Sequence, residues 1–466
     1  MSKQEVRPFG FRDKIGYMLG DVANDFSFIF ASSYVMVFYT KVMGISTGMV
    51  GTMFLIARCI DAFTDIGMGR IVDRSQPTKN GRIRPWILRM CAFVALASFL
   101  MYQSFLVDAS YGAKVAYMFI TYILWGSIFY TSINIPYGSM ASVISADPKD
   151  RSSLSVFRSM GGGIAGILIG VLAPLVVYHT DAAGNQVVSA SSMSMIAGVF
   201  SVCAIVCYLL CYALTQERVE YVPQPESERK NIGQTLKTLV SSRALIGLII
   251  SAILLLLASL MSQGVNNYLF ADYFKNTKAL SMFSVLMLPC MIILAAISTK
   301  LATKFGKREC SMVGMIVSGI LYFIIGLMKI KSVWLFVGLI FVAMLGMYFF
   351  QMQVWALVTD VIDDLEVQTG SRDDGTIYGM YSFSRKIGQA IAGGLSGWAL
   401  GWIGYDELAV SQTQEVANGI YNLATLFPAV IYLACGLVLM FVFPLTKAKV
   451  ESNVAELKRR REAANN

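Results

Sequence analysis

The chain has 466 residues, of which 56% are hydrophobic and 14% charged, and its mean hydropathy is +0.61. Because a soluble domain is usually about one quarter charged, this composition excludes a large soluble protein and indicates an integral membrane protein. The net charge of +9 does not call for a nucleic acid partner, since basic cytoplasmic loops explain it. One histidine and eight cysteines without a CxxC pair give no support to a zinc site, a redox site or an enzyme.

The amino-terminal stretch "MSKQEVRPFGFRDK" is polar and basic and contains no signal-peptide pattern, so we expect the first helix to stay in the membrane. A helix needs roughly 20 residues to cross a bilayer. Twelve segments fit this length, at 14–42, 46–70, 84–107, 113–144, 153–178, 192–214, 241–272, 279–304, 309–329, 332–362, 376–404 and 417–446.

A polar break from Thr215 to Thr235 divides the twelve segments six and six. This pattern predicts an all-α membrane protein with the major facilitator fold, built from two six-helix halves. The expected parts are an N-terminal half (1–214), a cytoplasmic linker (215–240), a C-terminal half (241–446) and a basic cytoplasmic tail (447–466).

Basic residues choose the cytoplasmic side, because Lys and Arg gather in cytoplasmic loops. The connections after the second, fourth and eighth segments are basic, and so is the tail; they include Arg74, Lys79, Arg82, Arg84, Lys149, Arg151, Lys304, Lys307 and Arg308. The opposite connections "HTDAAGNQ" and "YDELAVSQTQE" contain no Lys or Arg, although "MKIKS" is a minor exception. We therefore expect a multi-pass protein of the plasma (inner) membrane with both termini in the cytoplasm, contacting the lipid bilayer and functional as a monomer.

Charged residues inside apolar segments are candidates for function because they are costly in hydrocarbon. In "IARCIDAFTDIGMGRIVDRS", Asp61 and Asp65 share one face of a helix, and Arg58 lies three residues before the first of them. Two carboxylates and a nearby hydroxyl could hold Na⁺ or carry a proton. The alternative is a structural salt bridge with Arg58 or Arg158.

A second group of charges could recognise a sugar. Asp25 lies in the middle of the first segment and Arg158 near the start of the fifth, and together they could accept from and donate to vicinal hydroxyls. A buried Asp25–Arg158 bridge is the alternative, and Asp21 is interpreted as mainly structural.

In the eleventh segment, Lys386 could neutralise the two aspartates of the second segment, whereas Arg385 could simply extend to the cytoplasm. The acidic stretch Asp360–Thr376, which includes Asp363, could pair with basic loops of the other half or be a solvated loop. In the loop "GRIVDRSQPTKNGRIRPW", Asp73 and Arg74 are expected to hold the cytoplasmic ends of neighbouring helices.

Several motifs, taken in order, resemble the glycoside–pentoside–hexuronide:cation symporters, the family of the melibiose permease. They are "LGDVANDF", "RCIDAFTDIGMGRIVDRS", "NIPYGSM", "VFRSMGGGI", "TDVIDDLE" and "SRKIGQAIAGGLSGWALGWIGY". The resemblance implies that Asp61, Asp65 and Thr131 bind the cation, that Asp25 and Arg158 bind the sugar, and that Lys386 lies near both sites.

The chain departs from the melibiose permease at several site positions. Thr64 stands where the cation site has asparagine, which leaves Na⁺ and H⁺ both open. Asn134, Asn24 and Trp355 are expected at the sugar site: Asn134 stands where an aspartate is found, Asn24 where the permease has a lysine, and Trp355 one residue away from a tryptophan. Gly138 replaces a further tryptophan. We therefore do not predict melibiose as the substrate.

The sequence predicts a secondary active symporter that imports a sugar or glycoside with Na⁺ or H⁺ by alternating access, with no cofactor beyond that cation. One alternative keeps the fold and changes the cargo, for example to a lysophospholipid. A non-transporting sugar receptor is another, but the cytoplasmic segments are too short for a signalling domain.

Overall fold

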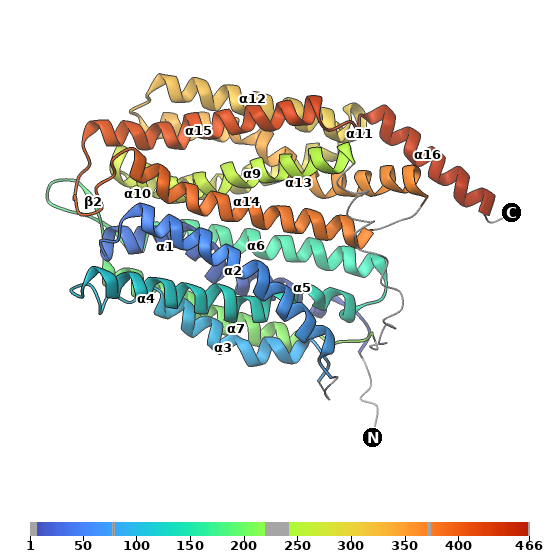
Figure 1. Cartoon of the computed structure of the whole chain (residues 1–466), viewed down its shortest axis with the longest axis horizontal. Coiled ribbons are helices and arrows are strands. Elements are labelled where there is room, and N and C mark those ends of the chain that lie inside the picture. The colour runs from blue at the N-terminus through green and yellow to red at the C-terminus, as the bar shows by residue number, and fades with distance from the viewer. Residues whose placement is uncertain (1–6, 77, 79, 220–241, 371–373, 465–466) are drawn as a thin grey trace. The chain divides into compact units, whose positions relative to one another are not determined.

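The computed structural model describes residues 7–76, 78, 80–219, 242–370 and 374–464 (Figure 1). The elements labelled η are π-helical turns that continue or join α-helices. In chain order the elements are α1 (Phe11–Val37), η1 (Phe38–Val42), α2 (Thr47–Arg74), α3 (Arg84–Leu100), α4 (Tyr111–Ile123), η2 (Leu124–Tyr130), α5 (Thr131–Ile144), α6 (Pro148–Val177), β1 (Tyr178–Thr180), β2 (Gln186–Val188), α7 (Ala190–Leu214), α9 (Arg243–Tyr268), η4 (Leu269–Tyr273), α10 (Thr277–Val285), α11 (Met287–Phe305), α12 (Lys307–Met328), α13 (Val333–Thr369), α14 (Asp374–Trp402), α15 (Gln414–Phe441) and α16 (Lys447–Ala464).

Helices occupy each of the twelve segments expected from the sequence. In the described residues, nine candidate spans are long and apolar enough to cross a membrane. Outside this set lie α2, α3, α14 and the tail helix α16; α3 has 17 residues, and α2 carries the charged residues that lower its hydropathy. A membrane protein is therefore confirmed, and the number of twelve spans stays a prediction.

The structure describes the expected linker only in part and shows a helix in the expected basic tail. Most of the linker, residues 220–240, lies outside the described residues. The basic tail contains a helix, α16, in which Asn453 is buried and donates a hydrogen bond to Asp364 at 2.8 Å.

Side chains at the helix starts explain several element boundaries. Asp147, Ser189 and Ser332 precede α6, α7 and α13, and each accepts a hydrogen bond from a backbone N–H of the first turn. Such a cap satisfies a donor that has no partner within the helix. α13 ends at Gly370, whose positive φ of 72° suits glycine at a helix C-terminus.

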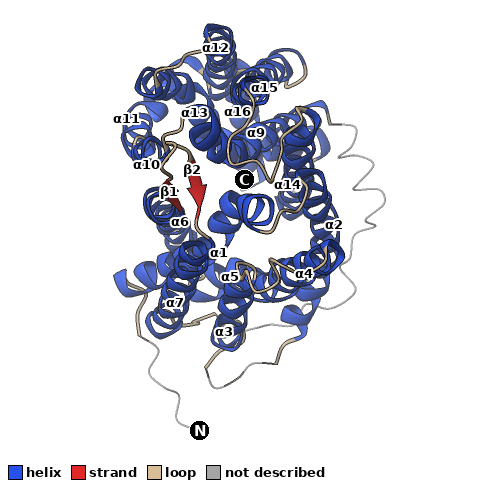
Figure 2. Ribbon diagram, turned by 90° about the vertical axis from the view of Figure 1, so that its left-hand side faces the viewer, coloured by secondary structure: helices blue, strands red, loops and turns tan. Residues whose placement is uncertain are grey.

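The described residues form two compact units, each of which is considered by itself. The first comprises residues within Met1–Gln224, Phe270–Val285 and Ser396–Thr413, and the second comprises the remainder, so α14 contributes to both. In the first unit α1 packs against α6 and α7, and α3 packs against α7, as the end-on view of these helices shows (Figure 2). The strands β1 and β2 form an antiparallel hairpin between α6 and α7.

In the second unit α12 packs against both α13 and α15. Gly314 of α12 and Gly346 of α13 lie against each other, and a Cβ atom on Gly346 would come within 2.6 Å of the Gly314 carbonyl carbon. Glycine at this crossing therefore allows the two backbones to touch, as small residues do between membrane helices.

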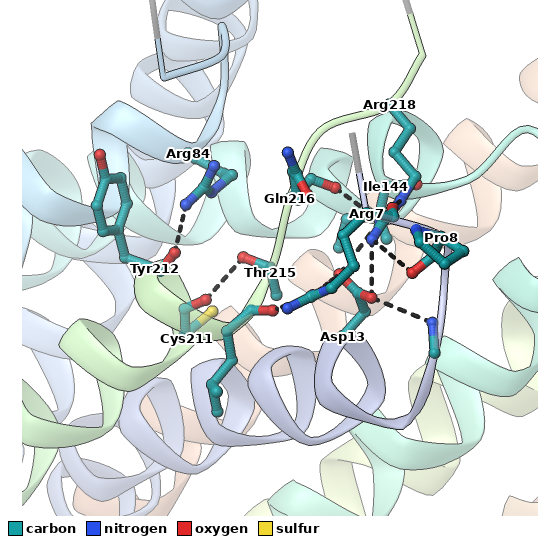
Figure 3. A network of polar contacts seen from close by, with 12 residues as sticks. Arg7, Pro8, Asp13, Arg84, Ile144, Cys211, Tyr212, Thr215, Gln216 and Arg218 are labelled. Carbon is teal, nitrogen blue, oxygen red and sulfur yellow. Dashed lines mark hydrogen bonds and ion pairs between the residues drawn. The ribbon is translucent and has the colours of Figure 1, made fainter. Parts of the chain in front are cut away.

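Polar contacts fix both ends of α1 in the first unit. Near its start, the fully buried Asp13 pairs with Arg7 at 3.0 Å and with Arg218 at 2.9 Å (Figure 3). Beyond its other end, Lys41 of η1 pairs with Asp272 of η4 at 3.0 Å, and the Tyr405 hydroxyl donates to the same carboxylate at 3.0 Å. The Asp13–Arg218 and Lys41–Asp272 pairs each join residues more than 200 positions apart in the chain.

Another carboxylate caps α3 from a distance in the sequence. Glu217, which follows α7, accepts hydrogen bonds from the backbone N–H groups of Arg82, Ile83 and Arg84 at 2.7 to 2.8 Å. Arg84 in turn donates to the backbone oxygen of Tyr212 at the end of α7 (Figure 3). An acidic group at a helix N-terminus is stabilised by the helix dipole as well as by these bonds.

Candidate functional site

The two aspartates of α2 each meet a hydroxyl group from the helix beside it. The Ser127 hydroxyl of η2 donates to Asp61 Oδ1 at 2.5 Å, and the Thr131 hydroxyl of α5 donates to Asp65 Oδ1 at 2.8 Å. Because both pairs are four residues apart in their helices, they form two successive carboxylate–hydroxyl contacts along the α2 interface.

Arg58 completes the surroundings of Asp61. Its Nη1 atom lies 3.0 Å from Asp61 Oδ2, so each oxygen of this buried carboxylate has a donor. The Arg58 guanidinium also lies over the ring of Phe28, 5.4 Å from its centre. The salt bridge with Arg58, which the sequence offered as the structural alternative, is thus present, and it involves Asp61.

The Thr64 hydroxyl does not point to the cation site in which the sequence analysis placed it. Its hydroxyl lies 3.3 Å from the carbonyl oxygen of Ile60 and 3.2 Å from that of Asp61, both in its own helix. The structure therefore does not bring the Thr64 hydroxyl to the carboxylates, and Ser127 is the second hydroxyl there. Ser127 lies four residues before Thr131, a spacing that could have indicated the same helix face.

The oxygen atoms of this cluster suit a small hard cation. Asp61, Asp65, Ser127 and Thr131 offer carboxylate and hydroxyl oxygens, which hard cations prefer to nitrogen or sulfur. Within the described residues, no group of three or more His, Cys, Asp or Glu could hold a metal ion. Because the donors of this cluster are all oxygen atoms, they fit Na⁺ or a proton better than a soft transition metal.

A second cluster joins α1 and α6. Arg158 Nε donates to Asp21 Oδ1 at 2.9 Å, and its guanidinium lies over the ring of Tyr137, 5.2 Å from the centre. The ion pair of Arg158 is thus with Asp21, which the sequence assigned a mainly structural role, and not with Asp25. Among the described residues, none donates a hydrogen bond to the Asp25 side chain.

Glycines of α6 make room for these acids. A Cβ atom on Gly162 would lie 2.7 Å from Asp25 Oδ2 and 3.2 Å from Asp21 Oδ2, so the two carboxylates flank the same small residue. A Cβ atom on Gly161 would lie 2.5 Å from the backbone oxygen of Met18. The "GGG" stretch of α6 therefore lets Asp21, Asp25 and Arg158 gather in one place.

Two asparagines were predicted beside the sugar, and they have different surroundings. Asn24 is 1% exposed and its Oδ1 accepts a hydrogen bond from Tyr208 of α7 at 2.8 Å. The structure thus places the Asn24 side chain in the interior against α7. Asn134 is half-buried on α5.

The predicted residues of the second unit lie on α13 and α14. Trp355 is 42% exposed and packs edge-on against Tyr381, with the ring centres 5.0 Å apart. The Arg385 guanidinium lies 5.6 Å from the centre of the Trp355 ring, and Lys386 is half-buried. Trp355 and Arg385 are therefore neighbours, a contact that the sequence did not suggest.

The acidic end of α13 makes contacts within the second unit. Asp360 pairs with Lys307 at 2.5 Å, and Asp364 accepts from Gln368 and Asn453. Asp363 is half-buried. Its pairing with loops of the other half stays a prediction, and residues 371–373 of the acidic stretch lie outside the described residues.

The loop after α2 is only partly described. Arg74 is exposed at the end of the helix. The side chain of Asp73 lies outside the described part, so its expected role stays a prediction.

Comparisons with known proteins agree with this fold. A family model described as MFS/sugar transport protein matches residues 16–447. A glucuronide carrier protein homolog of Escherichia coli (strain K12) is 31% identical over 455 residues, covering 97% of this chain and 96% of the relative. An uncharacterized symporter of Bacillus subtilis (strain 168) is 29% identical over 461 residues, covering 98% and 97%.

Among solved structures, the inward-open xylose transporter of Escherichia coli matches with a TM-score of 0.65 and 13% identity, covering 95% of this chain and 98% of that one. The fold is therefore that of a major facilitator transporter. The chain belongs to the MFS/sugar transport family and, within it, to the glycoside–pentoside–hexuronide:cation symporters. Membership of this family of transporters confirms the predicted fold class and the prediction of a symporter rather than an enzyme.

Proposed function

We propose that the chain imports a glycoside together with one cation, Na⁺ or H⁺, and that the cation binds at Asp61 and Asp65. The observation that carries this assignment is the pair of carboxylate–hydroxyl contacts to Ser127 and Thr131 along α2. Carboxylate and hydroxyl oxygens are the ligands that a hard cation such as Na⁺ prefers, and the two carboxylates can also carry a proton.

The sugar would bind beside Asp25 and Arg158. Asp25 can accept hydrogen bonds from sugar hydroxyls, and Arg158 keeps further N–H groups because its pair with Asp21 uses Nε. A relative is named a glucuronide carrier homolog, so a glucuronide is the first substrate to test. Asn134, Trp355 and Lys386 stay in the proposal as further contacts of the sugar, and Lys386 as a charge that replaces the cation in the empty carrier.

Alternating access would couple the two substrates. The carrier would switch between its two orientations readily when empty or fully loaded and poorly when it holds one substrate. The basic connections place both termini in the cytoplasm in this proposal. We propose that the plasma-membrane protein works as a monomer.

The test is uptake of a glucuronide into membrane vesicles with an imposed Na⁺ or pH gradient. Asp65→Asn removes a negative charge and should abolish accumulation against a gradient. It should leave substrate exchange without net transport partly active, because the sugar contacts remain. An Asp181→Asn variant, altered in the exposed turn between β1 and β2, serves as the control and should behave as wild type.

Uphill accumulation by Asp65→Asn equal to wild type would contradict the cation site. Uptake of a lysophospholipid that sugars do not compete for would instead support the alternative cargo.

A further inference from the structure

The hydroxyl of Ser127 has no role in the residue set expected from the sequence, yet it makes the shortest contact of the α2 cluster. We propose that Ser127 is a fourth oxygen ligand of a Na⁺ site formed with Asp61, Asp65 and Thr131, and that this set makes Na⁺ the coupling ion. The inference rests on the proposed symport and names its cation.

The hydrogen-bond directions leave the hydroxyl oxygens available to a cation. A serine or threonine hydroxyl has one O–H donor and two acceptor lone pairs. The Ser127 hydroxyl donates to Asp61 at 2.5 Å, and the Thr131 hydroxyl has two acceptors, Asp65 Oδ1 at 2.8 Å and the backbone oxygen of Gly126 at 3.2 Å. Their lone pairs can therefore coordinate a cation while both O–H groups still stabilise the aspartates.

Ser127 takes the place that the sequence assigned to Thr64. The Thr64 hydroxyl is turned to the carbonyl oxygens of Ile60 and Asp61 in its own helix. Ser127, by contrast, is 1% exposed and directed across the interface to α2. A buried hydroxyl aimed at a carboxylate from a neighbouring helix can bridge that helix and a bound ion.

The local backbone supports this position. Ser127 lies in η2, the π-helical turn Leu124–Tyr130, and such turns are found frequently at functional sites. Its neighbour Gly126 lies beside Asp61, since a Cβ atom there would be 3.9 Å from Asp61 Oδ1. The absence of a side chain at Gly126 leaves space next to the same carboxylate oxygen that Ser127 contacts.

The number of oxygen ligands needed differs between Na⁺ and a proton. A proton needs one carboxylate oxygen, whereas Na⁺ is bound by several oxygen ligands at once. A change that removes the Ser127 oxygen should therefore weaken Na⁺ binding and leave proton binding by the aspartates in place.

The experiment measures thermal unfolding of the purified protein against Na⁺ concentration, with choline replacing Na⁺ at constant ionic strength. A ligand that binds the folded state raises its stability by RT ln(1 + [L]/Kd), so a site with a higher Kd needs proportionally more ligand for the same stabilisation. Wild type should be stabilised by Na⁺. Ser127→Ala should need about tenfold more Na⁺ for the same stabilisation, the scale of effect seen when one supporting group of a metal site is lost.

Three further variants complete the design. Ser127→Cys keeps the approximate size and replaces a hard oxygen by a soft sulfur, so it should lose Na⁺ affinity like Ser127→Ala. Ser127→Thr keeps the hydroxyl and should retain affinity. Ser132→Ala is the matched control: its hydroxyl, five residues away, bonds to Ile128 of its own helix at 2.6 Å, and the Na⁺ response should equal that of wild type.

Two outcomes would overturn the inference. One is an unchanged Na⁺ response in both Ser127→Ala and Ser127→Cys while Asp61→Asn loses it. The other is a wild-type protein that Na⁺ does not stabilise but whose glucuronide uptake follows a pH gradient. The second result would leave the proposed symport standing with a proton, so the two ideas can fail separately.

Discussion

At the scale of single residues, the two acids of α1 have different surroundings although they are one helical turn apart. Asp21 holds Arg158 in an ion pair, whereas Asp25 receives no hydrogen bond from a described residue. This division implies that Asp21 positions the arginine and that Asp25 is available to a substrate hydroxyl.

Asp25→Asn should therefore weaken binding of p-nitrophenyl glucuronide and leave the fold intact. Loss of a hydrogen bond to a charged group costs about 1.5–3 kcal/mol, a reduction of roughly 10- to 100-fold in affinity. Isothermal titration calorimetry of the purified protein measures the affinity, and thermal unfolding checks the fold. Asp21→Asn should lower stability as well as affinity, because it leaves Arg158 without its partner. Equal effects of the two variants on both quantities would refute the division of roles.

The sequence predicted more about which residues matter than about how they pair. Thr131 contacts Asp65, one helical turn from Asp61, because residues four apart share a helix face whatever the partner helix is; their binding of a cation stays a prediction. The pairing of Arg158 with Asp21, the inward position of Asn24 and the contact of Ser127 depend on which faces of different helices meet. Helix periodicity alone does not define those contacts.

At the scale of elements, the close packing of α1 and α6 depends on small residues. Gly161 leaves no room for a Cβ atom, since the backbone oxygen of Met18 would be 2.5 Å away. Gly166, in the same helix, would meet Ile29 at an ordinary distance of 3.6 Å. The two positions therefore form a matched pair for testing the packing.

Gly161→Ala should destabilise the protein by about 1–3 kcal/mol, the usual cost of overpacking an interior. Gly166→Ala should have a much smaller effect, since its new methyl group fits. Thermal unfolding in the same detergent compares the two variants with wild type. A Gly161→Ala protein as stable as Gly166→Ala would mean that the helices separate there without cost.

The helices themselves were the most predictable feature at this scale, because long apolar runs between polar connections leave few alternatives in a membrane. The π-helical turns η1, η2 and η4 were not predicted. A single widened turn changes one hydrogen-bond step in a long helix and leaves the apolar pattern almost unchanged.

At the scale of the whole molecule, the charge distribution predicts the orientation in the membrane. The carboxyl-terminal helix α16 ends in the basic run "KRRRE", and cytoplasmic segments are enriched in Lys and Arg. Both termini should therefore face the cytoplasm.

A reporter that is active only in the cytoplasm should give signal when fused after residue 466 or before residue 1. The same reporter inserted in the exposed turn near Gly184, between β1 and β2, should be silent. Signal from the Gly184 insertion and silence at both termini would reverse the orientation.

The contacts of Glu217 and Arg218 also bear on how the protein can be divided into two polypeptides. Glu217 caps α3 and Arg218 pairs with the buried Asp13, so the first unit depends on residues that follow its last long helix. A split gene cut within codons 220–241 keeps both side chains with the helices they hold. A cut at residue 215 would remove the Glu217 cap of α3 and would leave the buried Asp13 without Arg218. We therefore expect the N-terminal fragment from that cut to be degraded by proteases in the cell.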